Sequence, residues 1–272
     1  MVPAVLHSLW PVLLNAMEAR FCYLTERLPQ GRCFRQEATL SCISGWASDT
    51  FNTVLGVPSS FENVKAISMQ YRHYQWPASW WLPEQASEEV RGWLRQMGWE
   101  HAESDVAMAC EMKALPALSQ RPMFHVRRVE SIEDMQLFGA LISTIFEQDA
   151  PVEAAEVREV YSAMRPPEQG QMDWQLLIGS EDNIPVATAS VFIRDGVASI
   201  NDIATHPAYR RRGIGTAMFE AALQCIHESG AGWCVLQASK SGQPLYARQG
   251  FSALGTIDTW NLSECIDKEY RY

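Results

Sequence analysis

The chain has 272 residues, a formal net charge of −10 at pH 7, and 47% hydrophobic residues. This length and composition predict a folded protein with one large domain or two medium ones. The acidic balance argues against nonspecific nucleic-acid binding, which requires a basic face. No apolar run approaches the roughly 18 residues that a membrane span needs. Seven cysteines without a Cys-x-x-Cys pair indicate neither a disulfide framework nor a zinc site, and they fit a reducing cytoplasm.

In the first half, the pattern predicts a helix at residues 2–20, two partner strands at 36–43 and 53–57, a turn and helix at 83–99, and a strand at 105–115. The segment 2–20 is expected to be an amphipathic helix docked on the first domain. It is not expected to be a signal peptide, because no basic residue precedes its apolar run. Seven of the ten tryptophans lie before residue 100. They indicate core packing, with an aromatic substrate pocket as the alternative.

A proline-containing linker is expected at residues 115–122, and the pattern becomes sharper after it. Strands are predicted at 124–128, 173–179, 186–193, 197–205, 233–238 and 251–260. Helices are predicted at 131–146, 154–164, 213–229 and 241–249. Ser131 with Asp134 indicates a capping box, and Asp195-Gly196 indicates a hairpin turn. The order is strand, two helices, three strands, helix, strand, helix, strand, which is typical of a mixed α+β fold.

A basic stretch with two glycines follows the strand that ends at Thr205. It reads Thr-His-Pro-Ala-Tyr-Arg-Arg-Arg-Gly-Ile-Gly and ends at Gly215. Glycine lets the backbone approach a ligand closely, and the amides at a helix start carry the positive end of the helix dipole. Because three arginines add charge, the stretch predicts a site for a phosphate or pyrophosphate.

Three motifs resemble those of the GNAT acetyltransferase superfamily. The pattern Arg210-x-x-Gly213-x-Gly215 is similar to that family's acyl-CoA pyrophosphate motif, and residues 202–207 resemble its fourth strand and loop. Residues 236–239 and 245–251 resemble its fifth strand and the helix after it. The resemblance covers about residues 123–260. It implies an α+β fold in which a central mixed sheet is flanked by helices.

The first half is similar to the degenerate GNAT-like halves of some two-domain members. The resemblance therefore implies a degenerate domain at 1–120 and a catalytic domain at 121–272. The first half has no Arg-x-x-Gly-x-Gly loop, so no second CoA site is expected there.

The resemblance implies acetyl-CoA as co-substrate and no metal. The main chain of Ile203 and Thr205 would pair with the pantetheine arm as an added strand does. The amides from Arg211 to Thr216 would cradle the pyrophosphate. The residues expected to contact acetyl-CoA are Ile203, Ala204, Thr205, Arg210, Arg211, Arg212, Gly213, Ile214, Gly215, Thr216, Ser239 and Tyr246.

Tyr246 is the candidate general acid, because a phenol can protonate the thiolate that leaves a thioester. The alternative is that its ring packs beside Phe251. Members of the family often carry a carboxylate where this chain has Asn201, which cannot accept a proton at useful pH. Asp202 would serve as the base if the strand bulges, with a structural role as the alternative. His206 titrates in the right range but is expected to be exposed, and a water chain is a further route.

Five carboxylates lie where the family places the border of the acceptor pocket, and they would attract a cationic amine. They are Glu147, Asp149, Glu153, Glu156 and Glu159. The alternative is an ordinary solvated helix face. The leading hypothesis is a cytoplasmic N-acetyltransferase that acts on a primary amine of a small molecule or peptide. The alternatives are a catalytically silent acyl-CoA-binding regulatory protein and an enzyme that transfers a longer acyl group.

Overall fold

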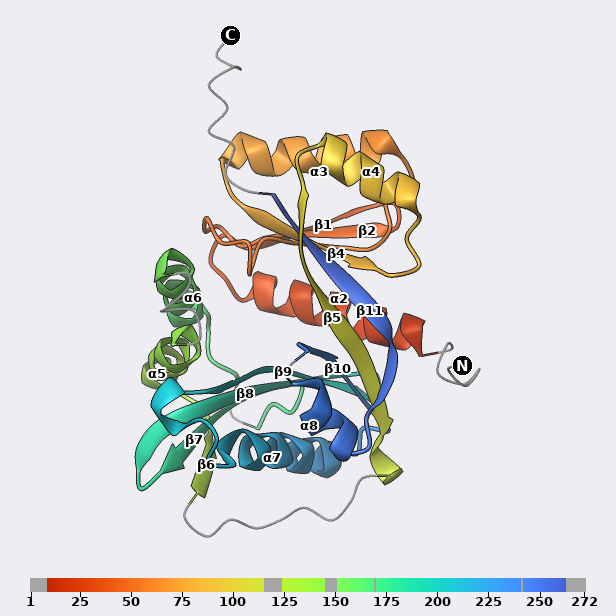
Figure 1. Cartoon of the computed structure of the whole chain (residues 1–272). Helices are drawn as coiled ribbons and strands as arrows, with labels where there is room; N and C mark the ends of the chain where they lie inside the picture. Colours follow the sequence, from red (N-terminus) through yellow and green to blue (C-terminus); the bar gives the residue numbers. More distant parts are fainter. Residues whose placement is uncertain (1–8, 115–123, 145–150, 169, 241, 263–272) are drawn as a thin grey trace. The chain divides into compact units, whose positions relative to one another are not determined.

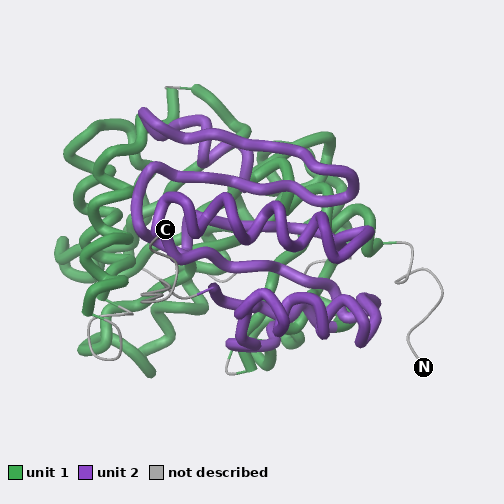
Figure 2. Tube along the Cα trace, turned by 90° about the horizontal axis from the view of Figure 1, so that it is seen from above, with its two compact units in different colours: residues 1–20, 106–255 green, residues 21–105, 256–272 purple. Residues whose placement is uncertain are grey.

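The structure is a computed structural model that describes residues 9–114, 124–144, 151–168, 170–240 and 242–262. The chain divides into two compact units, drawn in different colours in Figure 2. Unit 1 comprises residues 1–20 and 106–255, and unit 2 comprises residues 21–105 and 256–272. Each unit is a sheet with helices packed against it, and the elements carry the labels of Figure 1.

The described residues of unit 2 form five strands in the order β1-β2-β3-β4-β11. Its helices α3 and α4 both begin at a serine whose hydroxyl accepts a hydrogen bond from a first-turn amide, which is the usual N-cap arrangement. The elements are β1 Arg32–Gln36, β2 Thr39–Ile43, β3 Thr53–Leu55, α3 Phe61–Tyr74, β4 Ala78–Pro83, α4 Glu88–Gln96 and the second part of β11 Ser252–Leu262. The helix α2 Trp10–Glu26 crosses from unit 1 into unit 2.

In the described part of unit 1 there are six strands, in the order β5-β10-β9-β8-β7-β6. Helix α7 lies along one face of this sheet, against β8 and β9 (Figure 1). The elements are β5 Glu100–Glu111, η1 Met112–Ala114, β6 Phe124–Arg128, α5 Ile132–Ser143, α6 Pro151–Ala163, β7 Trp174–Glu181, β8 Ile184–Arg194, β9 Val197–Thr205, η2 Pro207–Tyr209, α7 Ile214–Ser229, β10 Trp233–Ala238 and α8 Gln243–Arg248.

The two units repeat one succession of strand pairings. In unit 1 the described pairs are antiparallel except β9 with β10, and in unit 2 they are antiparallel except β3 with β4. A helix joins each parallel pair, α7 in unit 1 and α3 in unit 2, as a parallel connection requires. The first half therefore has the GNAT-like arrangement that the sequence resemblance implied.

The closing strand of each half pairs in the other unit. Strand β5 follows β4 and α4 along the chain but pairs with β10, where Trp233 lies opposite Glu111. Strand β11 follows β10 and α8 but pairs with β4, where Trp260 lies opposite Trp80. The borders of the compact units therefore do not coincide with the expected boundary at residue 120. The division into 1–120 and 121–272 stays a prediction about the two halves of the sequence.

The mixed α+β order predicted for the second half is confirmed element by element. Ser131 caps α5 by accepting a hydrogen bond from the Asp134 amide at 3.1 Å. Asp195 and Gly196 both have positive φ, 52° and 75°, as a two-residue hairpin turn requires. The buried face of α7 includes Ile214 and Met218, as its period predicted.

The first half required more correction. The strand expected at 36–43 is a hairpin of β1 and β2, because the chain turns at Glu37, which has a φ of 56°. Helix α3 was not predicted, and α2 continues to Glu26 instead of ending at residue 20. The strand expected at 105–115 begins at Glu100. The linker expected at 115–122 lies outside the described residues.

Candidate functional site

Strands β9 and β10 part from one another in the middle of the unit 1 sheet. They pair in parallel only where residues 197–199 face residues 233–235. Strand β9 continues to Thr205 and β10 to Ala238, but no pairing joins residues 200–205 to residues 236–238. The other edge of β10 is fully paired with β5. The main chain of β9 beyond Ser199 therefore faces an opening on the side of β10, where an extended ligand can pair with it.

A β-bulge lies in β9 at this opening. On β8, Thr188 faces Ala204 and Ser190 faces Asn201, so the single residue between them faces two residues of β9. Asp202 has a φ of 55°, which is unusual for a residue other than glycine. The Thr188 hydroxyl donates a hydrogen bond to the Asp202 carbonyl at 2.8 Å and holds the bulge. A bulge in this strand is the condition under which Asp202 was predicted to serve as the base.

The Asp202 carboxylate is held by two partners that the sequence analysis missed. Arg20, on α2, donates to its two oxygens at 3.0 and 3.2 Å, and the Tyr161 hydroxyl, on α6, donates at 2.9 Å. The side chains of Arg20 and Asp202 are only 12% and 19% exposed. Burial raises the pKa of Tyr161 well above 10, and the Asp202 charge adds to the shift, so this phenol stays protonated and acts as a donor. A carboxylate in such an ion pair is positioned to order the bulge.

Asn201 and His206 lie on either side of this region. The Asn201 amide donates to the Ser199 hydroxyl at 3.1 Å. His206 is half-buried, and its Nδ1 accepts from the Ala208 amide at 3.3 Å, so it caps the short helix η2. The ring of His206 also packs edge-on against Tyr209. His206 was expected to be an exposed side chain, but it has a structural role as the cap of this turn.

The start of α7 presents main-chain donors. Arg211 and Gly213 have φ values of 64° and 77°, so the chain turns sharply before the helix, and no side chain caps Gly213. The first-turn amides of a helix lack partners within the helix and carry partial positive charge. A Cβ added at Gly215 would meet only the Thr205 Oγ1 within 4 Å, at 3.6 Å. The protein itself therefore does not need a glycine at position 215.

The three arginines of the loop have different surroundings. The Arg210 Nε donates to the Thr205 carbonyl at 3.1 Å. Arg212 forms an ion pair with Glu181 at 2.6 Å and lies over the Tyr209 ring, 5.2 Å from its centroid. Arg211 is exposed. Their positions support the predicted positive charge near the α7 start, although Arg212 already has a carboxylate partner.

Tyr246 lies on the short helix α8 and is half-buried. Its ring packs edge-on against Phe219, with centroids 5.0 Å apart, and lies 6.4 Å from the Phe251 ring. This packing orients the ring and is compatible with both roles considered for Tyr246. The exposed Ser239 accepts hydrogen bonds from the Gly242 amide through its carbonyl at 3.0 Å and its hydroxyl at 3.3 Å.

The acidic cluster expected at the acceptor side is described only in part. Glu147 and Asp149 lie outside the described residues. Glu153, Glu156 and Glu159 lie on α6, where the first two are half-buried and the third is exposed. Tyr161, the donor to Asp202, lies on the same helix. Helix α6 therefore carries both the predicted acidic side chains and one of the groups that hold the bulge.

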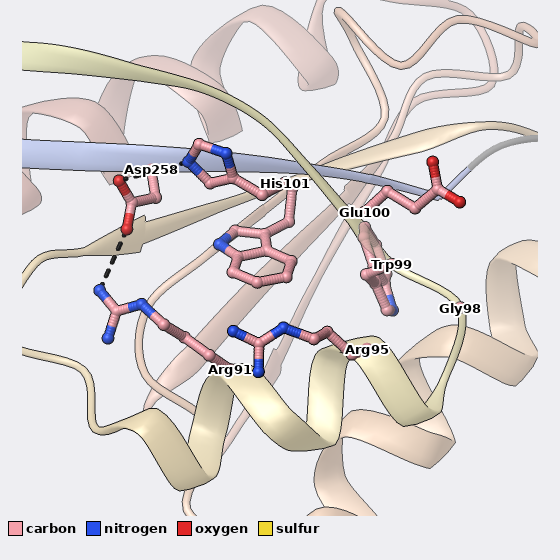
Figure 3. Close-up of a pocket in the computed structure, with 8 residues that line it drawn as sticks. Arg91, Arg95, Gly98, Trp99, Glu100, His101 and Asp258 are labelled. Atoms are coloured by element: carbon pink, nitrogen blue, oxygen red, sulfur yellow. Dashed lines mark hydrogen bonds and ion pairs between the residues drawn. The ribbon is translucent and has the colours of Figure 1, made fainter.

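A pocket of about 560 Å³ lies in unit 2, beside α4, β5 and β11 (Figure 3). It is lined by Arg91, Arg95, Gly98, Trp99, Glu100, His101, Asp258 and Trp260. Arg91 forms an ion pair with Asp258 at 3.0 Å. Arg95 pairs with Glu88 at 2.7 Å and lies over the Trp260 ring. Charges of both signs offset one another here, so the pocket does not have the character of an anion site.

Three tryptophans of unit 2, Trp80, Trp99 and Trp260, are buried in its core, and its other described tryptophans are half-buried. Trp80 and Trp99 are fully buried and pack edge to face, with centroids 5.3 Å apart. Their indole N–H groups donate to the Gly56 carbonyl and the Ser68 hydroxyl at 2.9 and 2.8 Å. For these two residues, the interpretation as core packing is confirmed.

The comparisons with known proteins agree with this geometry. Residues 173–253 match the family model of the acetyltransferase (GNAT) domain. A GCN5-related N-acetyltransferase from Kribbella flavida has a similar structure, with a TM-score of 0.68, 19% identity, and coverage of 92% of this chain and 94% of that one. Another from Sphaerobacter thermophilus has a TM-score of 0.56 and 14% identity, covering 83% and 80%.

A tandem GNAT protein from the clavulanic acid biosynthesis pathway is also similar, with a TM-score of 0.50, 12% identity, and coverage of 93% and 95%. At these identities the structural likeness shows the fold alone. No curated protein matches the sequence. Within the described residues, no helix combines the length and apolar character that crossing a membrane would need.

Proposed function

We propose that this protein, which carries an acetyltransferase (GNAT) domain and is an acyltransferase, uses acetyl-CoA as its donor. It moves the acetyl group to a primary amine of a small molecule or peptide. The observation that carries the proposal is the parting of β9 and β10 directly before the uncapped start of α7. An extended chain that ends in a pyrophosphate requires this combination of an unpaired strand edge and converging amides.

In this proposal the pantetheine arm pairs with the main chain of β9 at Ile203 and Thr205, beside Ala204. The pyrophosphate accepts hydrogen bonds from the amides of Arg211 to Thr216, and the exposed Arg211 adds charge. A Cβ at Gly215 would make only an ordinary contact with the Thr205 Oγ1, at 3.6 Å, so the protein leaves room there for a close approach of the ligand. Arg210, Ile214 and Ser239 complete the proposed contacts, whereas Arg212 is held by Glu181.

The chemical step is direct attack of the neutral amine on the thioester carbonyl. The C–N bond forms, the C–S bond breaks, and the departing thiolate takes a proton from the Tyr246 hydroxyl. The amine must lose a proton as well. Asn201 cannot accept it, and Asp202 is engaged by Arg20 and Tyr161. We therefore assign the proton to a chain of water molecules and give Asp202 the role of ordering the bulged strand.

The acceptor is proposed to be cationic, because Glu153, Glu156 and Glu159 lie along α6 beside the residue that holds the bulge. A panel of polyamines, aminoglycosides, amino acids and peptide N-termini, assayed by thiol release, tests this choice. For a cationic acceptor, kcat/KM falls as ionic strength rises, whereas a neutral acceptor leaves it nearly constant. A preference for neutral or anionic acceptors would refute this part of the proposal.

A matched pair of glycine substitutions tests the donor site and separates an effect on acetyl-CoA binding from an effect on folding. Gly215 and Gly92 both lie in helices, and a Cβ meets open space or ordinary contacts at each. Replacement by alanine therefore stabilises each helix, by up to about 1 kcal/mol. We expect Gly215→Ala to weaken acetyl-CoA binding about tenfold in calorimetry, because its methyl group meets the ligand, and Gly92→Ala to leave binding unchanged. Equal affinities in the two variants would contradict the proposed position of the pyrophosphate.

The second candidate is a catalytically silent acyl-CoA-binding protein. It is favoured by one observation, that Asn201 and the ion-paired Asp202 leave β9 without an available carboxylate base. This candidate predicts acetyl-CoA binding without turnover on any amine, and one robust substrate excludes it. With a substrate in hand, Tyr246→Phe should lower kcat by about 100-fold with little change in acetyl-CoA affinity. An unchanged kcat would remove Tyr246 from the chemical step.

A further inference from the structure

Three cysteines that are well separated in the sequence meet in unit 2. Cys22 lies on α2, Cys33 on β1 and Cys42 on β2, and their three sulfur atoms all lie within 4.8 Å of one another. Cys33 and Cys42 lie directly opposite in the β1–β2 ladder, with their sulfurs 3.5 Å apart. The spacings of 11 and 9 residues match no familiar metal motif, so this cluster could not be predicted from the sequence.

The sulfur positions fit a single metal ion. Zinc–thiolate bonds are about 2.3 Å long, so sulfurs in a tetrahedral site are roughly 3.8 Å apart. The cluster reaches such separations with small side-chain movements. Cys22 and Cys33 are half-buried and Cys42 is buried, so an ion can enter from the exposed side and retain a water there.

The thiols also differ from the other cysteine pair of this fold. Cys110 and Cys234 lie opposite one another in β5 and β10, but each thiol contacts a main-chain oxygen, at 3.5 and 3.9 Å, within an apolar core. In the cluster the Cys33 thiol also lies 3.8 Å from a main-chain oxygen, that of Cys22, but the three sulfur atoms are gathered within 4.8 Å of one another.

We propose that Cys22, Cys33 and Cys42 form a binding site for one thiophilic metal ion, Zn²⁺ with a water as fourth ligand or three-coordinate Cu⁺. Soft thiolate ligands select these ions over Mg²⁺ or Ca²⁺. Binding replaces the remaining thiol protons, which pass to the solvent, by sulfur–metal bonds. The ion joins α2 to the β1–β2 hairpin and stabilises unit 2. None of the residues proposed for acetyl transfer belongs to this site.

Metal titration of the full-length protein tests this site. The protein is reduced, freed of metal with a chelator under anaerobic conditions, and titrated with Zn²⁺, Cu⁺, Co²⁺ or Mg²⁺ against a chromophoric competitor. We expect one equivalent of Zn²⁺ or Cu⁺, a sulfur-to-cobalt charge-transfer band with Co²⁺, no response to Mg²⁺, and a higher melting temperature with the bound ion. Of Zn²⁺ and Cu⁺, the ion that binds more tightly is the one assigned to the site.

Cys33→Ser removes one ligand from a half-buried strand position and should weaken metal binding by more than about 100-fold. Loss of a residue that only hydrogen-bonds to a metal ligand weakens binding less than this, by about 10- to 100-fold. Cys22→Ser provides a second variant with the same expected result, should the first fail to fold. Cys110→Ala is the control that retains the cluster and its affinity. Equal affinity in the wild type and both cluster variants would overturn the proposal. A Cys33–Cys42 disulfide that forms on mild oxidation, in a protein whose reduced form binds no metal, would also overturn it.

Discussion

The ion pair between Arg20 and Asp202 should be one of the strongest single contributions to the stability of unit 1. Arg20→Met removes the cation but keeps much of the apolar side chain. It leaves a carboxylate that is 19% exposed and that accepts a hydrogen bond from the Tyr161 hydroxyl. Asp202→Asn leaves the Arg20 guanidinium, 12% exposed, without its counterion.

The magnitude follows from the burial of the two groups. Breaking a fully buried pair by removing one partner costs about 3–5 kcal/mol, and a hydrogen bond to a charged group contributes about 1.5–3 kcal/mol. Because these side chains retain some contact with solvent, we expect each single substitution to cost about 2–3 kcal/mol. In a chain of this size, that loss lowers the melting temperature by about 5–10 °C.

A double-mutant cycle in urea unfolding measures the interaction. We expect Arg20→Met and Asp202→Asn together to cost less than the sum of the two, with a coupling free energy of about 1.5–3 kcal/mol. The exposed pair of Arg95 and Glu88 is the control, since its side chains are 54% and 74% exposed and its coupling should be below about 1 kcal/mol. If the Arg20–Asp202 coupling is as small as that of the control pair, the ion pair does not order the bulge as we argue.

Three further predictions concern single side chains. Burial, with the nearby Glu103 charge, raises the pKa of Asp105 to about 6, so the folded state binds a proton more tightly than the unfolded state and loses stability as pH rises from about 4 to 6. Asp105→Asn should therefore raise the free energy of unfolding at pH 8 by about 1 kcal/mol, a figure discounted for partial exposure, and should not raise it at pH 4. An equal gain at both pH values would contradict the assignment. Ser131→Ala should cost about 1 kcal/mol in chemical unfolding because α5 loses its cap, and no loss would mean that the cap is dispensable. Arg212→Met should destabilise the protein by about 1 kcal/mol but change acetyl-CoA affinity less than about threefold, because Glu181 already holds this arginine; a larger change in calorimetry would assign it to the phosphate.

The sequence alone specified the local features of the second half. The period of α7, the Ser131 cap and the Asp195-Gly196 turn each depend on residues close together in the chain, and all three are confirmed. The basic stretch that ends at Gly215 was likewise recognisable, because a strand, a sharp turn and a helix start are contiguous. The hairpin of β1 and β2 was missed, because it turns at Glu37, and glutamate is not a residue type that favours a positive φ.

Tertiary structure decided which distant groups meet. Arg20 lies 182 residues from Asp202, and Tyr161 lies 41 residues from it, so no local pattern joins these three side chains. The cluster of cysteines in unit 2 and the exchange of β5 and β11 between the halves have the same origin. Helix and turn signals arise from interactions between near neighbours, whereas ion pairs and strand partners depend on which edges and faces come together after folding. The sequence therefore indicated the basic loop before α7, and the structure showed which side chains hold the bulge in the strand that precedes it.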